Sequence, residues 1–257
     1  MAEPILMAKR VSFSYGDRHA IADVSLDVRE HELVAIVGPN GSGKSTLCRL
    51  LAGLRAPDAG AVQIEGSDVV KYNARARARF VAYLPQDLQV PFETSVLELV
   101  LLGRLSWQAG LALASDDDTT LAERALEFVG IADLAARPYG ALSGGERRRA
   151  AIAMVIAQSA RLLVLDEPAN ALDLRHAWDL LLRLRRDRRS AVIVVHDLAL
   201  AASCFDRALL LAGGRVVAFD TPDRALTEAT IEVAYGIPVH RVATSDGARA
   251  GFLPRPP

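Results

Sequence analysis

The chain has 257 residues, a formal net charge of −1, 51% hydrophobic residues and 24% charged residues. These values are typical of a globular protein that can bury a full core, and the length allows one or two domains. The balanced charge argues against a nucleic-acid-binding protein, which usually carries a basic face. We therefore expect no nucleic-acid partner.

The start of the chain, MAEPILMAKR, lacks the long apolar core of a secretory signal and includes an acidic residue and a proline. No uncharged stretch approaches the roughly 20 apolar residues of a membrane span, so we expect any membrane role to be peripheral. Cys48 and Cys204 are far apart and lack metal-ligand spacing. We interpret them as small buried residues of a protein in a reducing compartment.

Strand-like and helix-like segments alternate along the chain, which predicts an α/β fold with a largely parallel central sheet. The apolar runs at 162–165 and 192–195 suit strands that are covered on both faces. Gly213 and Gly214 separate two apolar runs, which indicates a hairpin. The expected strands are 5–14, 24–29, 33–37, 61–65, 80–84, 162–165, 191–195, 208–211 and 215–218.

The middle of the chain differs, because residues 94–158 have a helical pattern without a clear strand. Within it, residues 115–120 are expected to form a loop and a helix start, where acidic side chains favour the first turn. These features predict a helical subdomain inserted into an α/β core. The last stretch, 243–257, is rich in Gly, Pro and Arg and is expected to fray.

A glycine-rich segment begins directly after the apolar run 33–37 and leads into a helical pattern at 46–52. It fits G-x-x-x-x-G-K-[ST], the phosphate-binding loop, in the strand–loop–helix context that this motif requires. Its glycines let backbone N–H groups approach an anion, and the helix N-terminus adds a partial positive charge. Lys44 would reach the outer phosphates and Ser45 would offer a hydroxyl to Mg²⁺. The expected nucleotide-binding residues of the loop are Gly38, Pro39, Asn40, Gly41, Ser42, Gly43, Lys44, Ser45 and Thr46.

Two acidic residues, Asp166 and Glu167, follow the buried run 162–165. Ligands in α/β folds bind at the carboxyl ends of the strands, so this position suits a metal site. Asp166 is expected to support Mg²⁺, and Glu167 to orient and polarise a water molecule for in-line attack.

The sequence LSGGE at 142–146 has two interpretations. Ser143 and Glu146 fit an S-x-x-E capping box that opens a helix at 146–158. The two glycines between them would also leave a helix N-terminus bare, as an approaching phosphate requires.

LSGGE resembles the signature motif of the ATP-binding cassette (ABC) ATPases, and further motifs of that family occur in its usual order over residues 7–237. Tyr15 resembles the aromatic residue that stacks on adenine, and Gln86 the glutamine of the Q-loop. Asp173, in Ala171-Leu172-Asp173, resembles the D-loop aspartate. His196 resembles the switch histidine that contacts the γ-phosphate.

This resemblance implies an ATPase that uses ATP and Mg²⁺ and whose two copies face each other head to tail. The Lys44 loop of one copy and the signature loop of the other would enclose the same ATP. The residues implied for catalysis are Glu167, His196, Lys44 and Gln86. Those implied for the metal are Ser45, Gln86 and Asp166. Those implied for ATP, besides the glycine-rich loop, are Tyr15, Ser143, Gly144, Gly145 and Asp173.

The resemblance also implies a single ABC ATPase domain over 1–257. Residues 1–86 and 161–242 would form a P-loop NTPase (RecA-like) core with an antiparallel β subdomain. Residues 87–160 would form the helical subdomain, and 243–257 a flexible tail.

The segments 91–104, 172–176 and 233–237 resemble the ATPases of importers for iron chelates, haem and cobalamin. The implied partners are integral-membrane permease subunits and, indirectly, a substrate-binding protein, and the implied location is the cytoplasmic face of the cell membrane. Three alternatives stay open: an importer for zinc or manganese, a soluble ABC ATPase of assembly, repair or translation, and a binding module without turnover.

The remaining charged side chains receive no functional role. The arginines at 147–149 and 183–189 are expected on solvated helix faces. The histidines without an assigned role are His19, His31, His176 and His240.

Overall fold

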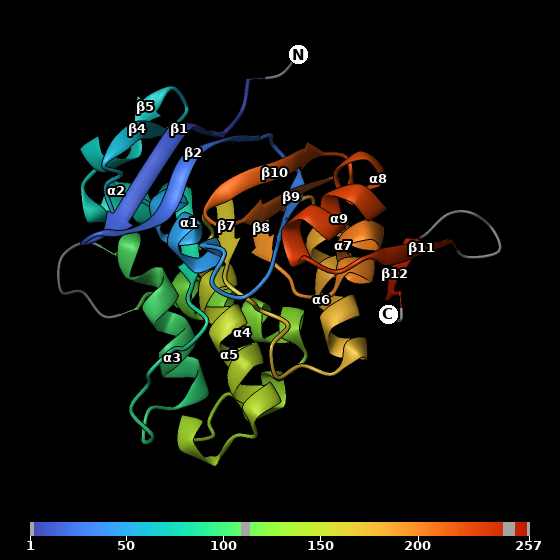
Figure 1. The fold of residues 1–257 in the computed structure, drawn as a ribbon. Helices are drawn as coiled ribbons and strands as arrows, with labels where there is room; N and C mark the ends of the chain where they lie inside the picture. Colours follow the sequence, from blue (N-terminus) through green and yellow to red (C-terminus); the bar gives the residue numbers. More distant parts are fainter. Residues whose placement is uncertain (1–2, 109–113, 244–249, 256–257) are drawn as a thin grey trace.

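Helices and strands follow one another along the described part of the chain, where the strands form two larger sheets and a small hairpin sheet. The computed structural model, shown in Figure 1, describes residues 3–108, 114–243 and 250–255. Within these ranges, no helix combines the length and apolar character needed to cross a bilayer. The predicted α/β fold class is confirmed.

The central sheet has six strands in the order β10-β9-β3-β8-β7-β6. The strands from β9 to β6 run parallel, and β10 pairs with β9 in the antiparallel sense as the hairpin predicted at Gly213-Gly214. Every residue of β3, β7 and β8 is buried, because both faces of the sheet are covered. The strands are β3 Leu33–Val37, β6 Val81–Leu84, β7 Leu162–Leu165, β8 Ser190–Val194, β9 Arg207–Ala212 and β10 Arg215–Asp220.

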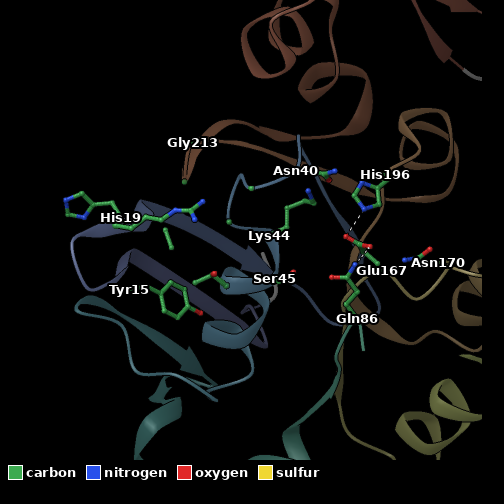
Figure 2. Close-up of a pocket in the computed structure, with 16 residues that line it drawn as sticks. Tyr15, His19, Asn40, Lys44, Ser45, Gln86, Glu167, Asn170, His196 and Gly213 are labelled. Carbon is green, nitrogen blue, oxygen red and sulfur yellow. Dashed lines mark hydrogen bonds and ion pairs between the residues drawn. The ribbon is translucent and has the colours of Figure 1, made fainter. Parts of the chain in front are cut away.

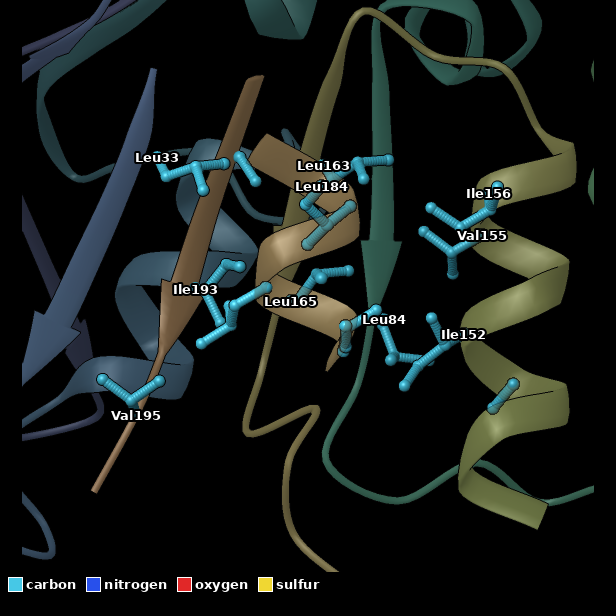
Figure 3. Packing of buried hydrophobic residues seen from close by; sticks show 14 of the residues in the cluster. Leu33, Leu84, Ile152, Val155, Ile156, Leu163, Leu165, Leu184, Ile193 and Val195 are labelled. Atoms are coloured by element: carbon cyan, nitrogen blue, oxygen red, sulfur yellow. The ribbon is translucent and has the colours of Figure 1, made fainter. Parts of the chain in front are cut away.

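Side chains of β3 alternate between two hydrophobic cores, as the period of a strand requires. Leu33, Ala35 and Val37 pack on the side of the helical segment. Val34 and Ile36 pack with helix α1, Lys44–Leu51, and with the antiparallel sheet. Figure 3 shows the first core, in which strand residues of the central sheet face α5.

The antiparallel sheet has the order β2-β1-β4-β5. Strand β2 begins at Arg18, six residues before the expected start, because a bulged pairing with β1 continues through Asp23, which has a positive φ of 56°. Arg207 of β9 joins the two sheets, since it donates to both carboxylate oxygens of Asp27 at 3.0 Å and to Glu32. The strands are β1 Leu6–Tyr15, β2 Arg18–Val28, β4 Ala59–Ile64 and β5 Ser67–Asp68.

Among the described residues between β6 and β7 there are three α-helices, and each begins with a capping box. The boxes pair Ser95 with Glu98, Ser115 with Asp118, and Ser143 with Glu146. The acidic cluster after Ser115 lies in the first turn of α4, as predicted. The helices are α3 Val96–Leu102, α4 Asp116–Val129 and α5 Gly144–Ala157.

Further helices lie between strands along the chain, and two of them, α6 and α7, join consecutive strands of the central sheet. They are α2 Ala74–Phe80, α6 Leu174–Arg186, α7 Leu198–Cys204, α8 Pro222–Ala225 and α9 Glu228–Tyr235. Short 3₁₀ helices are η1 Val69–Lys71, η2 Gly103–Ser106, η3 Ala132–Leu134 and η4 Tyr139–Ala141.

The C-terminal part differs from the expected flexible tail. Strand β11, Val239–Ala243, pairs in antiparallel register with β12, Ala250–Pro254. The two strands satisfy each other's backbone groups, and the Arg255 N–H extends the pairing by donating to Pro238 O at 2.9 Å. Composition alone indicated fraying, because it does not reveal that 239–243 pairs with 250–254. Residues 244–249 and 256–257 of the expected tail lie outside the described residues.

Candidate functional site

A cleft of about 990 Å³ opens over the glycine-rich loop, between the antiparallel sheet and the carboxyl ends of the central strands. It collects side chains from segments that are far apart in the sequence. Helix α1 begins with Lys44. The segments that follow β6, β7 and β8 supply Gln86, Glu167 and His196. The lining residues are Tyr15, Arg18, His19, Ala20, Asn40, Gly41, Gly43, Lys44, Ser45, Thr46, Gln86, Glu167, Asn170, His196, Gly213 and Gly214.

The glycine-rich loop is held against the neighbouring strands. Gly43 has a φ of 101°, and a Cβ at this position would lie 2.4 Å from Ala20 O, so only glycine fits. Helix α1 begins directly after Gly43, and no side chain caps its first N–H groups. The loop therefore presents free backbone donors and the positive end of a helix to the cleft.

Lys44 is buried at the base of this loop, with 6% of its surface exposed. Its Nζ donates to Gly38 O at 2.9 Å and to Pro39 O at 3.0 Å. Burial lowers the pKa of Lys44, and the nearby carboxylates of Glu167 and Asp166 act in the opposite direction. The ammonium group is thus desolvated and held by neutral carbonyls, which favours an incoming anion.

Asp166 follows β7 and is fully buried. Its backbone N–H donates to Leu84 O at 2.9 Å, but neither of its carboxylate oxygens has a hydrogen bond of normal geometry. Burial raises the pKa of this carboxyl group, while the nearby Ser45 hydroxyl acts in the opposite direction. A buried pair of unsatisfied acceptors beside a serine hydroxyl suits a cation.

Glu167 lies between Gln86 and His196, as Figure 2 shows. Nε2 of Gln86 donates to Oε2 of Glu167 at 3.0 Å, and Nε2 of His196 lies 2.6 Å from Oε1. The parallel strands β6, β7 and β8 are neighbours in the sheet, so their carboxyl ends bring these three side chains together. The structure thus joins three of the sequence-selected residues through one hydrogen bond and one ion pair.

Tyr15 lies on the other side of the cleft from Glu167, at the end of β1 (Figure 2). Its ring packs edge-on against Phe13, with centroids 4.9 Å apart, and 42% of the residue stays exposed. An exposed aromatic face beside the loop can accept a flat ring.

Several sequence-selected residues do not line the cleft of this chain, among them the buried Asp166. Four others come from two further segments: Ser143, Gly144, Gly145 and Asp173. Ser143 caps α5 through Glu146, and Asp173 accepts from the N–H of His176 at 2.8 Å at the start of α6. The two segments are neighbours, since a Cβ at Gly145 would lie 3.2 Å from Ala171 O. They form a separate surface outside the cleft.

The cleft also contains residues that the sequence did not select. Arg18, His19 and Ala20 enter it because the Ala22 N–H donates to Gly214 O at 2.8 Å, which places the start of β2 beside the β9–β10 turn. No local motif marks these positions. Asn170 could have been found, because it directly precedes the segment that resembles the D-loop. Gly38, Pro39 and Ser42 belong to the loop but do not line the cleft.

The uncapped loop, the buried lysine and the two acids at the end of a parallel strand define a P-loop nucleotide-binding protein. A family model described as ABC transporter matches residues 21–170. The chain is 44% identical to the hemin import ATP-binding protein HmuV of Streptomyces coelicolor, over 87% of this chain and 80% of that protein. It is 41% identical to the cobalamin import ATP-binding protein BtuD of Halobacterium salinarum, over 83% of this chain and 54% of that protein.

Solved structures show the same relationship. An inward-facing ABC transporter of the metal-chelate type matches with a TM-score of 0.85 and 27% identity, over 99% of this chain and 98% of that chain. A dimeric bacterial ABC transporter cassette matches with a TM-score of 0.77 and 26% identity, over 84% and 98% of the two chains. The chain belongs to the ABC transporter family. It has the P-loop NTPase fold of that family and is an ATP-binding subunit that hydrolyses ATP.

Proposed function

We propose that this chain is the ATPase subunit of an importer for an iron chelate, haem or cobalamin. The observation that carries this proposal is the 44% identity with a subunit named for hemin import, over 87% of the chain. A relative named for cobalamin import and a structural neighbour of the metal-chelate type support the same group of cargoes.

ATP would bind along the cleft, with its phosphates in the glycine-rich loop and its base against Tyr15. The backbone N–H groups at the start of α1 and the ammonium of Lys44 would bind the phosphates. Lys44 would exchange its contacts with the Gly38 and Pro39 carbonyls for phosphate oxygens. Tyr15 lines the cleft and stays partly exposed, and base–aromatic stacking contributes about 1–3 kcal/mol per base.

Asp166, Ser45 and Gln86 fit a Mg²⁺ ion, because the buried Asp166 oxygens are unsatisfied and the other two supply neutral oxygen ligands. When bound with ATP, the ion would neutralise phosphate charge. Glu167 would then act as the group that orients the attacking water and accepts its proton. Gln86 and His196 each contact one oxygen of Glu167 here, and each oxygen keeps a further lone pair that could accept from the water.

A second copy of the chain would complete the site. Ser143, Gly144, Gly145 and Asp173 lie outside the cleft of their own chain, so they would contact the ATP of a head-to-tail partner. The dimeric cassette among the structural neighbours supports this arrangement. ATP would join the two copies, and its hydrolysis would release them.

Replacing Ser143 by Ala is expected to lower ATP hydrolysis by at least about tenfold, because one hydrogen-bond donor to the partner's ATP is lost. ATP binding to the isolated monomer should stay within about twofold of the parent, since Ser143 acts in trans. Steady-state phosphate release and fluorescent-nucleotide titration measure the two quantities.

The matched control for Ser143→Ala is Ser95→Ala. Each serine donates to its glutamate Oε2 at 2.7 Å in a capping box of the same kind, so each change removes a helix cap worth about 1 kcal/mol. Ser95→Ala should leave hydrolysis unchanged. Weaker ATP binding by monomeric Ser143→Ala would mean that Ser143 acts within its own chain.

The membrane partners would be integral-membrane permease subunits that receive cargo from a substrate-binding protein. This chain would bind them at the cytoplasmic face of the cell membrane. The helical segment offers a surface for this contact, because several large apolar side chains on it are exposed. They are Phe92, Leu102, Leu105 and Trp107.

Affinity purification of the tagged chain from membranes of its own host is expected to co-purify a polytopic membrane protein. The variant Leu102→Asp should weaken this association, because it places a charge in the proposed contact surface. Val233→Asp, which changes an exposed residue on α9, should not. Metal and ligand analysis of the complex would separate haem, cobalamin or an iron chelate from zinc or manganese. A complex of water-soluble proteins alone would instead favour an ABC ATPase outside transport.

A further inference from the structure

Arg148 lies in α5 next to the signature segment, and its side chain is buried with 8% exposed. The expectation that residues 147–149 lie on a solvated helix face is therefore wrong for Arg148. The run of three arginines indicated exposure, but the side chain of Arg148 points into a ring of main-chain carbonyls. Its neighbour Arg149 is partly exposed and donates to Gly130 O at 3.3 Å.

The guanidinium group of Arg148 has five N–H donors, and five carbonyl oxygens accept from it. Nε donates to Pro168 O at 3.2 Å, and Nη1 donates to Pro85 O at 2.9 Å and to Gln86 O at 3.0 Å. Nη2 donates to Asp166 O at 2.6 Å and to Glu167 O at 2.7 Å. Burying a guanidinium is costly unless its donors are satisfied, and here every nitrogen is engaged.

The five carbonyls belong to the segments that follow β6 and β7, which carry Gln86 and Glu167. Glu167 has a φ of 52°, a left-handed conformation that costs free energy for a residue other than glycine. The carbonyls of Asp166 and Glu167 flank this strained position, and both accept from Nη2 of Arg148. The guanidinium group of Arg148 thus holds the backbone that sets the direction of the Glu167 side chain.

We propose that Arg148 is a positioning residue that links the signature helix to Gln86 and Glu167. The inference rests on the proposed role of Glu167 in hydrolysis. When the signature segment of one copy engages its partner's ATP, α5 moves with it, and Arg148 transmits this movement to both side chains in its own cleft. Hydrolysis in each cleft therefore depends on whether the signature segment of the same chain is engaged.

The test uses Arg148→Lys and Arg148→Gln in the full-length chain. Lysine keeps the positive charge facing Asp166 and Glu167, but it cannot span five carbonyls in two segments. We expect kcat to fall by about 10- to 100-fold, as when a reacting group is misplaced by about 1 Å. KM and the ATP affinity of the monomer should stay within about threefold. Arg149→Gln is the matched control and should change kcat by less than about twofold.

A second measurement separates positioning from stability. It is the change in kcat when guanidinium ion is added at low millimolar concentration. The guanidinium ion should raise the kcat of Arg148→Gln, while methylammonium should not, because only a planar fork can bridge the two segments. Circular dichroism checks the fold of each variant. Turnover of Arg148→Lys within twofold of the parent would overturn the proposal. An Arg148→Lys chain that fails to fold would also overturn it, in favour of a purely structural role.

Glu167→Gln, measured in parallel, separates this inference from the proposed function. If Glu167→Gln keeps normal turnover, the proposed role of Glu167 fails, and with it the basis of the coupling. If Glu167→Gln is inactive and the folded Arg148 variants are fully active, only the coupling fails. In the Glu167→Gln background, Arg148→Gln should cause no further loss of the residual rate.

Discussion

Replacing Glu167 by Gln is expected to lower ATP hydrolysis by about 100- to 10,000-fold, the range that general-base catalysis contributes. The amide keeps the shape of the side chain and can still contact Gln86 and His196, but it cannot accept a proton from water. ATP affinity should stay within about threefold. Since hydrolysis releases the two copies, ATP should hold this variant as a dimer.

Phosphate release and light scattering after size exclusion, both with ATP and Mg²⁺, measure these two effects. Glu123→Gln, an exposed carboxylate on α4, is the matched control and should behave like the parent protein. A Glu167→Gln chain that binds ATP and stays monomeric at all concentrations would contradict the proposed mechanism. Unchanged turnover would exclude Glu167 as the base.

Replacing Lys44 by Ala is expected to lower ATP affinity by at least about 30-fold. The ammonium is buried, and loss of one partner of a buried charge pair costs about 2–5 kcal/mol. The free protein should not be strongly destabilised, since Lys44 Nζ contacts neutral carbonyls there and its pKa is already lowered by burial. The variant should therefore fold but bind nucleotide weakly.

Isothermal titration with ATP measures the affinity, and thermal unfolding without nucleotide checks the fold. Lys71→Ala removes an exposed lysine at the end of η1 and should leave both quantities unchanged. ATP should raise the melting temperature of the parent and of Lys71→Ala, but not that of Lys44→Ala. Parent-like affinity in Lys44→Ala would refute the assignment of the phosphate-binding loop.

The sequence by itself determined the parts of this protein whose chemistry is local. The strand–loop–helix around Lys44 could be predicted because its glycines and hydroxyls are contiguous. The buried strands β7 and β8 could be predicted because strands that are covered on both faces consist of continuous apolar runs. The capping box at Ser143 also needs only residues three positions apart. The ABC family resemblance rested on the same kind of short motif.

The tertiary structure decided which distant segments meet. His19 and Gly214 line the cleft because of a backbone pairing between β2 and the β9–β10 turn, which no motif encodes. Strand β12 forms because β11 supplies its partner, although the composition of that stretch indicated fraying. The position of Arg148 differed most from its prediction. A run of charged residues predicts solvent exposure, whereas the burial of Arg148 depends on five main-chain carbonyls from two segments. Main-chain acceptors have no side-chain identity, so a site built from them leaves no pattern in the sequence and exists only once the strands are paired.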